Sequence, residues 1–346
     1  GNHEFDWGID VVEEVVGRSA APVLTANVKL GGKLAGERGD DGSPLGRVAP
    51  WVIREIAGFR VGLVGVTTPG LQYWLPPDLL AGLEAVDPAE AVAAAARELR
   101  ELGVDTVVVA GHMGSRFGKD DFANRVDGLL TRSVGLIDAY IGGHTHRDLP
   151  SMRVQRALYT QAGYFGIYLG RVDLTFDRET RKLVDSRAFT VLMDDRYPLD
   201  PVVMDRARDE IEISEQQLGR PVGRFAEAIP AVAAPGQPSG ISRLIAAAIR
   251  AALAKRGSQV DAVWHGQFID EDIPAGEQTL ADLWRVLPYE NRVVTASLTG
   301  SELRIVLEEM FATSRSKRNL IGAKVSTRRE GEVFKATQIV KADGAV

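Results

Sequence analysis

The most informative part of the chain is residues 104–146, which read VDTVVVAGHMGSRFGKDDFANRVDGLLTRSVGLIDAYIGGHTH. Two apolar runs in it, residues 104–110 and 136–141, are followed by Gly-His and by Gly-Gly-His-Thr-His. The pattern predicts a strand at each run and a helix over residues 119–132 between them. Strand, helix, strand is the α/β arrangement of a parallel sheet, whose strand ends share one edge.

The sequence on either side predicts further strands and one further helix. Residues 51–66 predict a hairpin, whereas residues 67–86 are too irregular for a helical or a strand period. A helix is expected from Asp87, a suitable N-cap, to a stop at Gly103. Beyond the second histidine motif, an antiparallel or mixed region is expected, with strands at residues 158–161, 167–176 and 183–192.

Length and composition bound the class of protein. The 346 residues suggest about two domains. Hydrophobic content is 45% and charged content 25%, which is ordinary for a globular protein. The net charge of −6 argues against a nucleic-acid scaffold as the partner, because such binding requires positive charge to neutralise phosphates. The chain has no cysteine, which excludes thiolate catalysis, disulfides and zinc–sulfur sites. No apolar run approaches the roughly 20 residues of a transmembrane helix.

A proline-containing break at residues 198–201 marks the expected domain boundary. A charged helix is expected after it, over residues 202–218, and we interpret it as a linker. The expected division is a first domain of residues 1–197, a linker helix of residues 198–218 and a second domain of residues 219–346. In the second domain we expect a strand at residues 222–229, a helix at 242–255 and a strand at 260–264.

Three histidines follow the two predicted strands, namely His112, His144 and His146. Imidazole is the usual nitrogen ligand of divalent transition metals, and glycine next to it lets the backbone approach an ion closely. A single histidine such as His112 is more often a satisfied polar residue, and His-x-His can arise by chance. The two motifs together, each after a parallel-type strand, favour a metal site over these alternatives.

The chain opens with a third histidine motif, Gly1-Asn2-His3-Glu4-Phe5-Asp6. Asn2 offers a neutral oxygen ligand, and His3 is either a ligand or a general acid. On a helical turn Asp6 would lie on the same face as His3 and could fix the tautomer of the imidazole. The alternative, a solvated Asp6 on an N-terminal turn, is equally compatible with the spacing.

Taken together, the three histidine motifs resemble those of the calcineurin-like metallophosphoesterases. More narrowly, they are similar to the 5′-nucleotidase/2′,3′-cyclic phosphodiesterase family. Three motifs in the second half are similar to the C-terminal substrate domain of that family: Asp272-Ile273-Pro274-Ala275-Gly276, Leu287-Pro288-Tyr289-Glu290-Asn291 and Leu298-Thr299-Gly300-Ser301-Glu302-Leu303.

The resemblance implies an α/β fold: an incomplete four-layer metallophosphoesterase-type sandwich plus a smaller α/β C-terminal substrate domain. It implies hydrolysis of phosphate esters, of the 5′-nucleotidase or cyclic-nucleotide phosphodiesterase type, with a small-molecule nucleotide as substrate. Two divalent metal ions, such as Zn, Mn, Fe or Co, would form a dinuclear centre. The family also suggests a periplasmic, cell-surface or extracellular location.

The resemblance assigns roles to individual residues of this sequence. One ion would be bound by Asn2, His112 and His144, and the other by His146. His3 would contact the transferred phosphoryl group and protonate the leaving oxygen, with Asp6 orienting it. Tyr289 would stack on the nucleobase.

Two departures from the family pattern limit this interpretation. The family's Asp-x-His and Gly-Asp motifs would precede Gly1, and without their carboxylates the visible ligands are neutral. Two neighbouring dications would then repel strongly, so we expect this chain alone to bind metal poorly and to be largely inactive. Gln267-Phe268-Ile269-Asp270 places an acid where the family has an arginine. The alternatives are hydrolysis of a non-nucleotide ester and a non-catalytic binding protein on the same fold.

Overall fold

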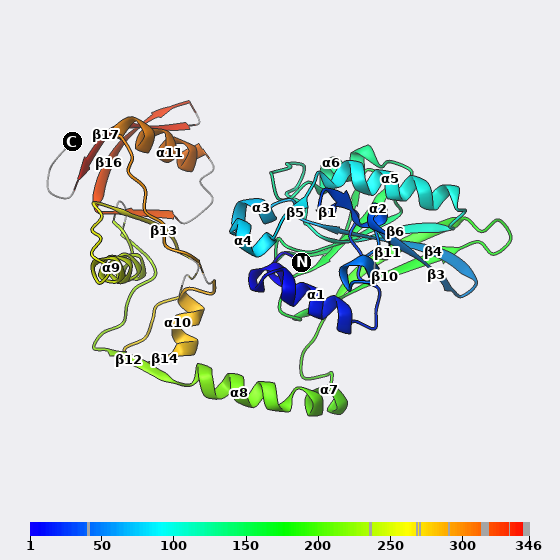
Figure 1. The fold of residues 1–346 in the computed structure, drawn as a ribbon, viewed down its shortest axis with the longest axis horizontal. Helices are drawn as coiled ribbons and strands as arrows, with labels where there is room; N and C mark the ends of the chain where they lie inside the picture. Colours follow the sequence, from blue (N-terminus) through cyan, green and yellow to red (C-terminus); the bar gives the residue numbers. More distant parts are fainter. Residues whose placement is uncertain are drawn as a thin grey trace. The chain divides into compact units, whose positions relative to one another are not determined.

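The computed structural model describes residues 1–39, 42–234, 237–267, 269, 271–289, 291–312, 318–331 and 333–341 (Figure 1). The chain divides into two compact units, Gly1–Pro198 and Leu199–Val346. Within the described ranges, none of the helices has both the length and the apolar character that crossing a bilayer requires.

The first unit is built on a six-stranded sheet in the order β3-β4-β6-β7-β9-β8. Its strands are β3 (Trp51–Ile56), β4 (Phe59–Thr67), β6 (Thr106–His112), β7 (Ala139–Gly142), β8 (Asp148–Val154) and β9 (Ala157–Ala162). The four central strands β4, β6, β7 and β9 run parallel, and β3 and β8 pair antiparallel at the two edges. The predicted α/β class is therefore confirmed.

The two faces of this sheet are covered by different layers. Side chains alternate along a strand, so Val107 and Val109 of β6 face one side and Val108 the other. Helices α5 (Pro88–Glu101) and α6 (Val126–Arg132) pack on the first side. The hairpin of β10 (Tyr168–Phe176) and β11 (Leu183–Leu192) packs on the second. The first unit thus has three layers: the two helices, the six-stranded sheet and the β10–β11 hairpin. Three layers are expected of an incomplete four-layer sandwich.

The remaining elements of the first unit form a smaller cluster beside the sheet. A three-stranded sheet, β2-β1-β5, packs with the N-terminal segment through Phe5, Leu71 and Leu83. These elements are η1 (His3–Trp7), α1 (Ile9–Arg18), β1 (Val28–Leu30), β2 (Lys33–Leu34), α2 (Ala35–Arg38), η2 (Leu45–Arg47), α3 (Leu71–Trp74), α4 (Pro77–Leu80) and β5 (Leu83–Ala85).

Several sequence predictions about local structure are confirmed. The hairpin of β3 and β4 turns at Ala57 and Gly58, both of which have positive φ, as a two-residue hairpin turn requires. Helix α5 begins after Asp87, whose carboxylate accepts a hydrogen bond from the backbone N–H of Ala89 at 2.9 Å. Strand β11 spans Leu183–Leu192, the range that the sequence predicts.

Other local predictions are wrong. Residues 67–86 contain α3, α4 and β5, although their sequence fits neither period. The helix predicted over residues 119–132 begins only at Val126, because Asp121 holds a turn before it. Asp121 Oδ1 accepts hydrogen bonds from the backbone N–H groups of Ala123 and Asn124, at 2.9 and 2.7 Å. The sequence also gives no signal for the edge strand β8.

The second unit begins with two short helices, α7 (Pro201–Arg206) and α8 (Arg208–Leu218), where one continuous helix was expected. A core of Ile241, Ile245, Ile273 and Val286 follows. Among the described residues, the unit also contains three two-stranded sheets, β12-β14, β13-β15 and β16-β17. The elements are β12 (Pro221–Phe225), α9 (Gly240–Ala254), β13 (Val263–Gly266), β14 (Gly276–Thr279), α10 (Leu280–Val286), α11 (Gly300–Ala312), β15 (Arg318–Ile321), β16 (Ala323–Glu330) and β17 (Val333–Lys341).

One carboxylate joins three segments of the first unit. Asp105, only 7% exposed, accepts hydrogen bonds from the backbone N–H of Arg60 at 2.6 Å and from Arg181 Nε at 2.8 Å. Residue 105 precedes β6, Arg60 lies in β4, and Arg181 lies in the turn between β10 and β11. The hydrogen bond from Arg181 lowers the pKa of Asp105 below its ordinary value. Such a carboxylate stabilises the fold above the pKa of the unfolded chain.

We predict that Asp105→Asn lowers the free energy of unfolding by about 2 kcal/mol at pH 7, since charge-assisted hydrogen bonds are lost. The difference from the wild type should shrink as the pH falls below about 4, because the wild-type carboxyl then becomes protonated. Urea denaturation at pH 7 and at pH 3 measures both effects. Asp185→Asn, which removes an exposed pair with Arg187, is the control and should change stability by less than about 0.5 kcal/mol. An equal loss for Asp105→Asn at both pH values contradicts the prediction.

Candidate metal centre

The register of the parallel strands brings two histidine motifs to one edge of the sheet. His112 is the last residue of β6 and pairs with Thr67 of β4. Tyr140 and Ile141 of β7 pair with Val109 and Ala110 of β6. The segment after β7, which contains His144, therefore leaves the sheet beside His112, as the sequence predicts.

The chain needs glycine where β6 approaches its neighbours. A Cβ on Gly111 would fall against the hydroxyl of Tyr140 and 2.7 Å from Val66 Cγ1. Both neighbours are buried, at 0% and 4% exposure, so neither can move away without disturbing the core. Close packing beneath β6 therefore explains the glycine of the Gly-His motif.

Asn2, His112 and His144 converge at this edge. His112 Nε2 and Asn2 Oδ1 lie 2.7 Å apart, and Asn2 is only 7% exposed. The rings of His112 and His144 are 5.3 Å apart between centroids, at an angle of 65°. Three of the four predicted metal ligands thus face a common region.

Burial lowers the pKa of both His112 and His144 to about 4. The positive charge of Arg116 adds to this effect at His144. Both rings are consequently neutral near pH 7. The neutral imidazole is the form that has a lone pair for a metal ion.

His146 packs differently from the other three predicted ligands. It is exposed, and its ring stacks on Tyr164 at 5.3 Å and lies 6.2 Å from Phe165. Among the residues that the structure describes, no three histidine or acidic side chains are grouped so that they could hold an ion. The structure therefore brings together a partial donor set rather than two complete ones.

The partial set has the chemistry of a site for one divalent ion. Two donors at about 2.1 Å from one ion, at a right angle, lie about 3 Å apart. The distance of 2.7 Å between His112 Nε2 and Asn2 Oδ1 is close to that spacing. Two imidazoles and one amide oxygen suit a borderline transition metal, and the three donors are neutral. The three residues thus fit one ion. Other ligands would have to supply the negative charge that balances it.

His3 and Asp6 form the pair that the sequence suggests. His3 Nδ1 and Asp6 Oδ2 are 2.7 Å apart, and the two side chains are 55% and 41% exposed. Both residues lie in η1, directly after Asn2. Because Asn2 contacts His112, the chain brings the pair close to the three converging residues.

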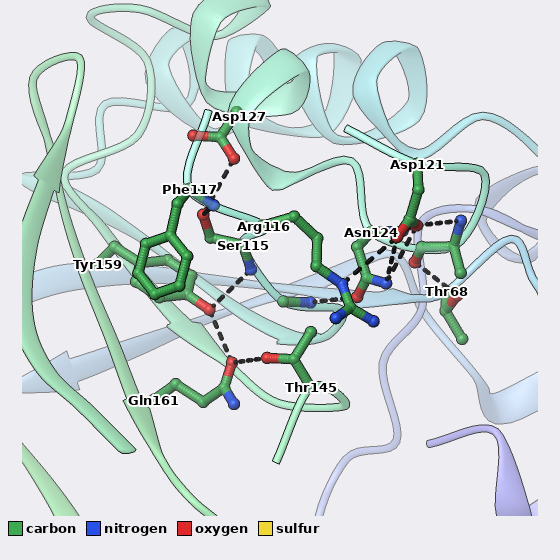
Figure 2. Close-up of polar contacts among 12 residues, drawn as sticks. Thr68, Ser115, Arg116, Phe117, Asp121, Asn124, Asp127, Thr145, Tyr159 and Gln161 are labelled. Atoms are coloured by element: carbon green, nitrogen blue, oxygen red, sulfur yellow. Dashed lines mark hydrogen bonds and ion pairs between the residues drawn. The ribbon is translucent and has the colours of Figure 1, made fainter. Parts of the chain in front are cut away.

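Two residues near the site have no signal in the sequence. The ring of Trp74 stacks on His144, with centroids 5.1 Å apart and an interplanar angle of 27°. Arg116 lies four residues after His112 and forms an ion pair with Asp121 at 3.4 Å (Figure 2). Both come from segments without a clear period, so only tertiary structure brings them to the site.

The proposed nucleobase contact, Tyr289, belongs to the second unit. It lies just after α10 and is 42% exposed. Gln267 has a structural role, since its Oε1 accepts hydrogen bonds from the hydroxyls of Ser239 and Ser242 at 2.6 and 3.0 Å. Asp270, the acid at the expected arginine position, lies outside the described residues, as does Phe268.

Comparisons with known proteins agree with this arrangement. Residues 221–336 match the model of the 5′-nucleotidase C-terminal domain. Over 90% of its own length, this chain is 26% identical to endonuclease YhcR of Bacillus subtilis. Over 64% of its own length, it is 26% identical to human 5′-nucleotidase. It covers 26% and 40% of those two proteins. The predicted resemblance to the 5′-nucleotidase family is confirmed.

A solved structure shows the same fold. The 5′-nucleotidase precursor of Thermus thermophilus aligns with the whole of this chain with a TM-score of 0.74, at 21% identity. The alignment covers 70% of that protein. The fold of this chain is therefore that of the aligned part of the 5′-nucleotidase precursor, and its mixed α/β class is as the sequence predicts.

We predict that Gly111→Ala lowers the free energy of unfolding by about 1–3 kcal/mol, because the new methyl group overpacks the buried Tyr140 and Val66. Chemical denaturation measures the loss. Gly170→Ala in β10 is the matched control, since its Cβ would lie at an ordinary 3.4 Å from Ala162 Cβ. Its effect should stay within about 0.5 kcal/mol. Equal stability of the two variants would show that the strands are not in close contact at Gly111.

Proposed function

We propose that this chain belongs to the 5′-nucleotidase family of calcineurin-like metallophosphoesterases and acts in the metal-dependent hydrolysis of nucleotide phosphate esters. The observation that carries the proposal is the convergence of Asn2, His112 and His144 at the carboxyl edge of a parallel sheet. The His3–Asp6 pair lies beside them. This edge is where α/β proteins place their ligands.

The proposed ligands are those that the family resemblance implies. Asn2, His112 and His144 would hold one divalent ion, and His146 would contribute to a second, with Zn, Mn, Fe or Co as candidates. Bound ions of this kind supply Lewis acidity to a phosphoryl group and positive charge that offsets its anionic oxygens. The neutral state of His112 and His144 near pH 7 supports their role as ligands.

His3 is the proposed general acid. The carboxylate of Asp6 accepts a hydrogen bond from His3 Nδ1, which leaves the opposite nitrogen, Nε2, to carry a proton toward the leaving oxygen. Both side chains are substantially exposed, so an approaching ester can reach the ring. The contact with Asp6 keeps the ring of His3 in one orientation.

The proposal extends to the rest of the chain. Residues 1–197 would be the metallophosphoesterase domain, residues 198–218 the linker and residues 219–346 the substrate domain, in which Tyr289 would stack on a nucleobase. The family match to residues 221–336 supports this division. The substrate would be a small nucleotide, and the protein would act in the cell envelope or outside the cell. A non-nucleotide ester, or binding without catalysis, is the alternative that a substrate panel would identify.

We predict metal-dependent hydrolysis by the protein as its gene encodes it. A nucleoside 5′-monophosphate or a 2′,3′-cyclic nucleotide should be turned over with Mn²⁺ or Zn²⁺, and a chelator should abolish turnover, since binding uses metal ligands. Phosphate release is measured, with a sugar phosphate in the same panel. The 346-residue chain alone should be far slower, because its proposed ligands are neutral.

The metal control compares a substitution at the site with one away from it. His112→Gln removes a proposed ligand and should abolish activity, whereas Gln155→Leu, at an exposed position of the same unit, should retain it. Turnover that persists in excess chelator contradicts the proposal. Binding of nucleotide without turnover, with metal present, would favour a non-catalytic protein.

We also predict that Asp6→Asn lowers kcat about 100-fold, because the ring of His3 loses the carboxylate that orients it as a general acid. KM should change little, since Asp6 does not itself contact the substrate in this proposal. Asp10→Asn, an exposed acid in the first turn of α1, is the control and should leave kcat unchanged. Steady-state kinetics over a range of pH checks both variants, and wild-type kcat in Asp6→Asn would rule out the assigned role.

A further inference from the structure

The segment that carries His144 and His146 has an unfavourable backbone conformation. His144 has φ of 71° and His146 has φ of 53°, in the left-handed region that residues with a side chain rarely adopt. The backbone N–H of Thr145 donates to the carbonyl oxygen of Gly143 at 2.8 Å, which closes a three-residue γ-turn around His144. A γ-turn with positive φ is rare and strained, and it persists only where its surroundings hold it.

One buried side chain holds this turn from both sides of His146. Gln161 lies near the end of β9 and is 1% exposed. Its Oε1 accepts a hydrogen bond from Thr145 Oγ1 at 2.9 Å, and its Nε2 donates to the carbonyl oxygen of Arg147 at 2.9 Å. Figure 2 shows the contact between Thr145 and Gln161.

The amide of Gln161 is in turn fixed by a second buried group. Tyr159, 0% exposed, donates from its hydroxyl to Gln161 Oε1 at 2.8 Å. The same hydroxyl accepts a hydrogen bond from the backbone N–H of Ser115 at 3.1 Å (Figure 2). Ser115 follows His112 in the chain, and its hydroxyl donates to Asp127 at the start of α6, at 3.0 Å. The contacts thus connect the loops that carry the two histidine motifs.

The two loops also touch directly. A Cβ on Gly114 would lie 2.5 Å from Thr145 Oγ1 and 2.8 Å from the carbonyl oxygen of Gly143. The turn around His144 therefore contacts both Gly114 and Gln161. A shift of the turn would disturb these contacts.

We propose that Gln161 is a positioning residue, which keeps the strained turn of residues 143–147 in place and thereby aims the imidazoles of His144 and His146. The inference rests on the proposed function for its metal ligands. Without Gln161, Thr145 and Arg147 lose buried hydrogen-bond partners, and residues 144 and 146 can return to ordinary negative φ. Both rings would then leave their present directions, because a change in φ rotates the side chain about the backbone.

Hydrogen exchange in the metal-free protein tests whether Gln161 holds the turn. The measurement does not require an active enzyme. In Gln161→Leu, the peptide spanning residues 142–148 should exchange at least about tenfold faster than in the wild type, because local opening becomes easier. Peptides from β4 and α5 should stay within about twofold. Unchanged exchange at residues 142–148 would overturn the proposal.

A matched control and a milder variant accompany this test. Gln155→Leu removes an exposed glutamine that also bonds a threonine hydroxyl, that of Thr131 at 3.2 Å, and it should leave exchange at residues 142–148 unchanged. Thr145→Val removes one hydroxyl without changing the shape of the side chain. It should increase exchange at the same residues and decides the question if Gln161→Leu does not fold.

Metal affinity tests the consequence for the imidazoles. The titration uses the protein as its gene encodes it, with Co²⁺ or Zn²⁺ as the probe. Calorimetry should show 10- to 100-fold weaker binding by Gln161→Leu, about the loss seen when the groups that orient metal ligands are removed. Gln155→Leu should bind as the wild type does. Faster exchange with unchanged affinity would overturn the positioning role. If the wild type binds no metal, the proposed function fails, whereas the exchange result still decides whether Gln161 holds the turn.

Discussion

The parallel pairing of β4, β6, β7 and β9 determines where the candidate side chains of the first unit can lie. Parallel strands end at a common edge, so a residue that follows one strand is close to the residue that follows its neighbour. His112 ends β6, and the turn of His144 follows β7 by one glycine. Gln161 lies near the end of β9, the next strand along. Three neighbouring strands thus supply a proposed ligand, the turn and the residue proposed to hold that turn.

Two buried tyrosines lie beneath this edge and connect its loops to the core. Tyr140 and Tyr159 stack with centroids 5.7 Å apart, and both are 0% exposed. Burial raises the pKa of both hydroxyls, that of Tyr159 to about 12, so each remains a hydrogen-bond donor at neutral pH. Tyr140 donates to the carbonyl oxygen of Met113, and Tyr159 to Gln161. Two buried core side chains therefore form hydrogen bonds with the segments around the proposed metal site.

The sequence predicts the parts of this arrangement that depend on local pattern. Apolar runs and caps predict β6, β7 and α5, and the motifs predict that His112 and His144 meet. It misses β8 and the turn before α6, because an edge pairing and a side-chain contact from Asp121 decide them. It also misses Gln161, since a glutamine in a strand has no distinguishing pattern. Sequence motifs thus indicate the proposed ligands but not the group proposed to orient them.

The motifs of the second unit show how such patterns have structural as well as functional causes. In Leu298-Thr299-Gly300-Ser301-Glu302-Leu303, Thr299 and Glu302 exchange hydrogen bonds of 2.8 and 3.2 Å that start α11. In Asp272-Ile273-Pro274-Ala275-Gly276, Ile273 is 1% exposed in the core, and Asp272 accepts a hydrogen bond from the backbone of Ala231. Folding alone explains these residues. In the proposed function, the choice of substrate would therefore depend on other groups, such as the exposed Tyr289.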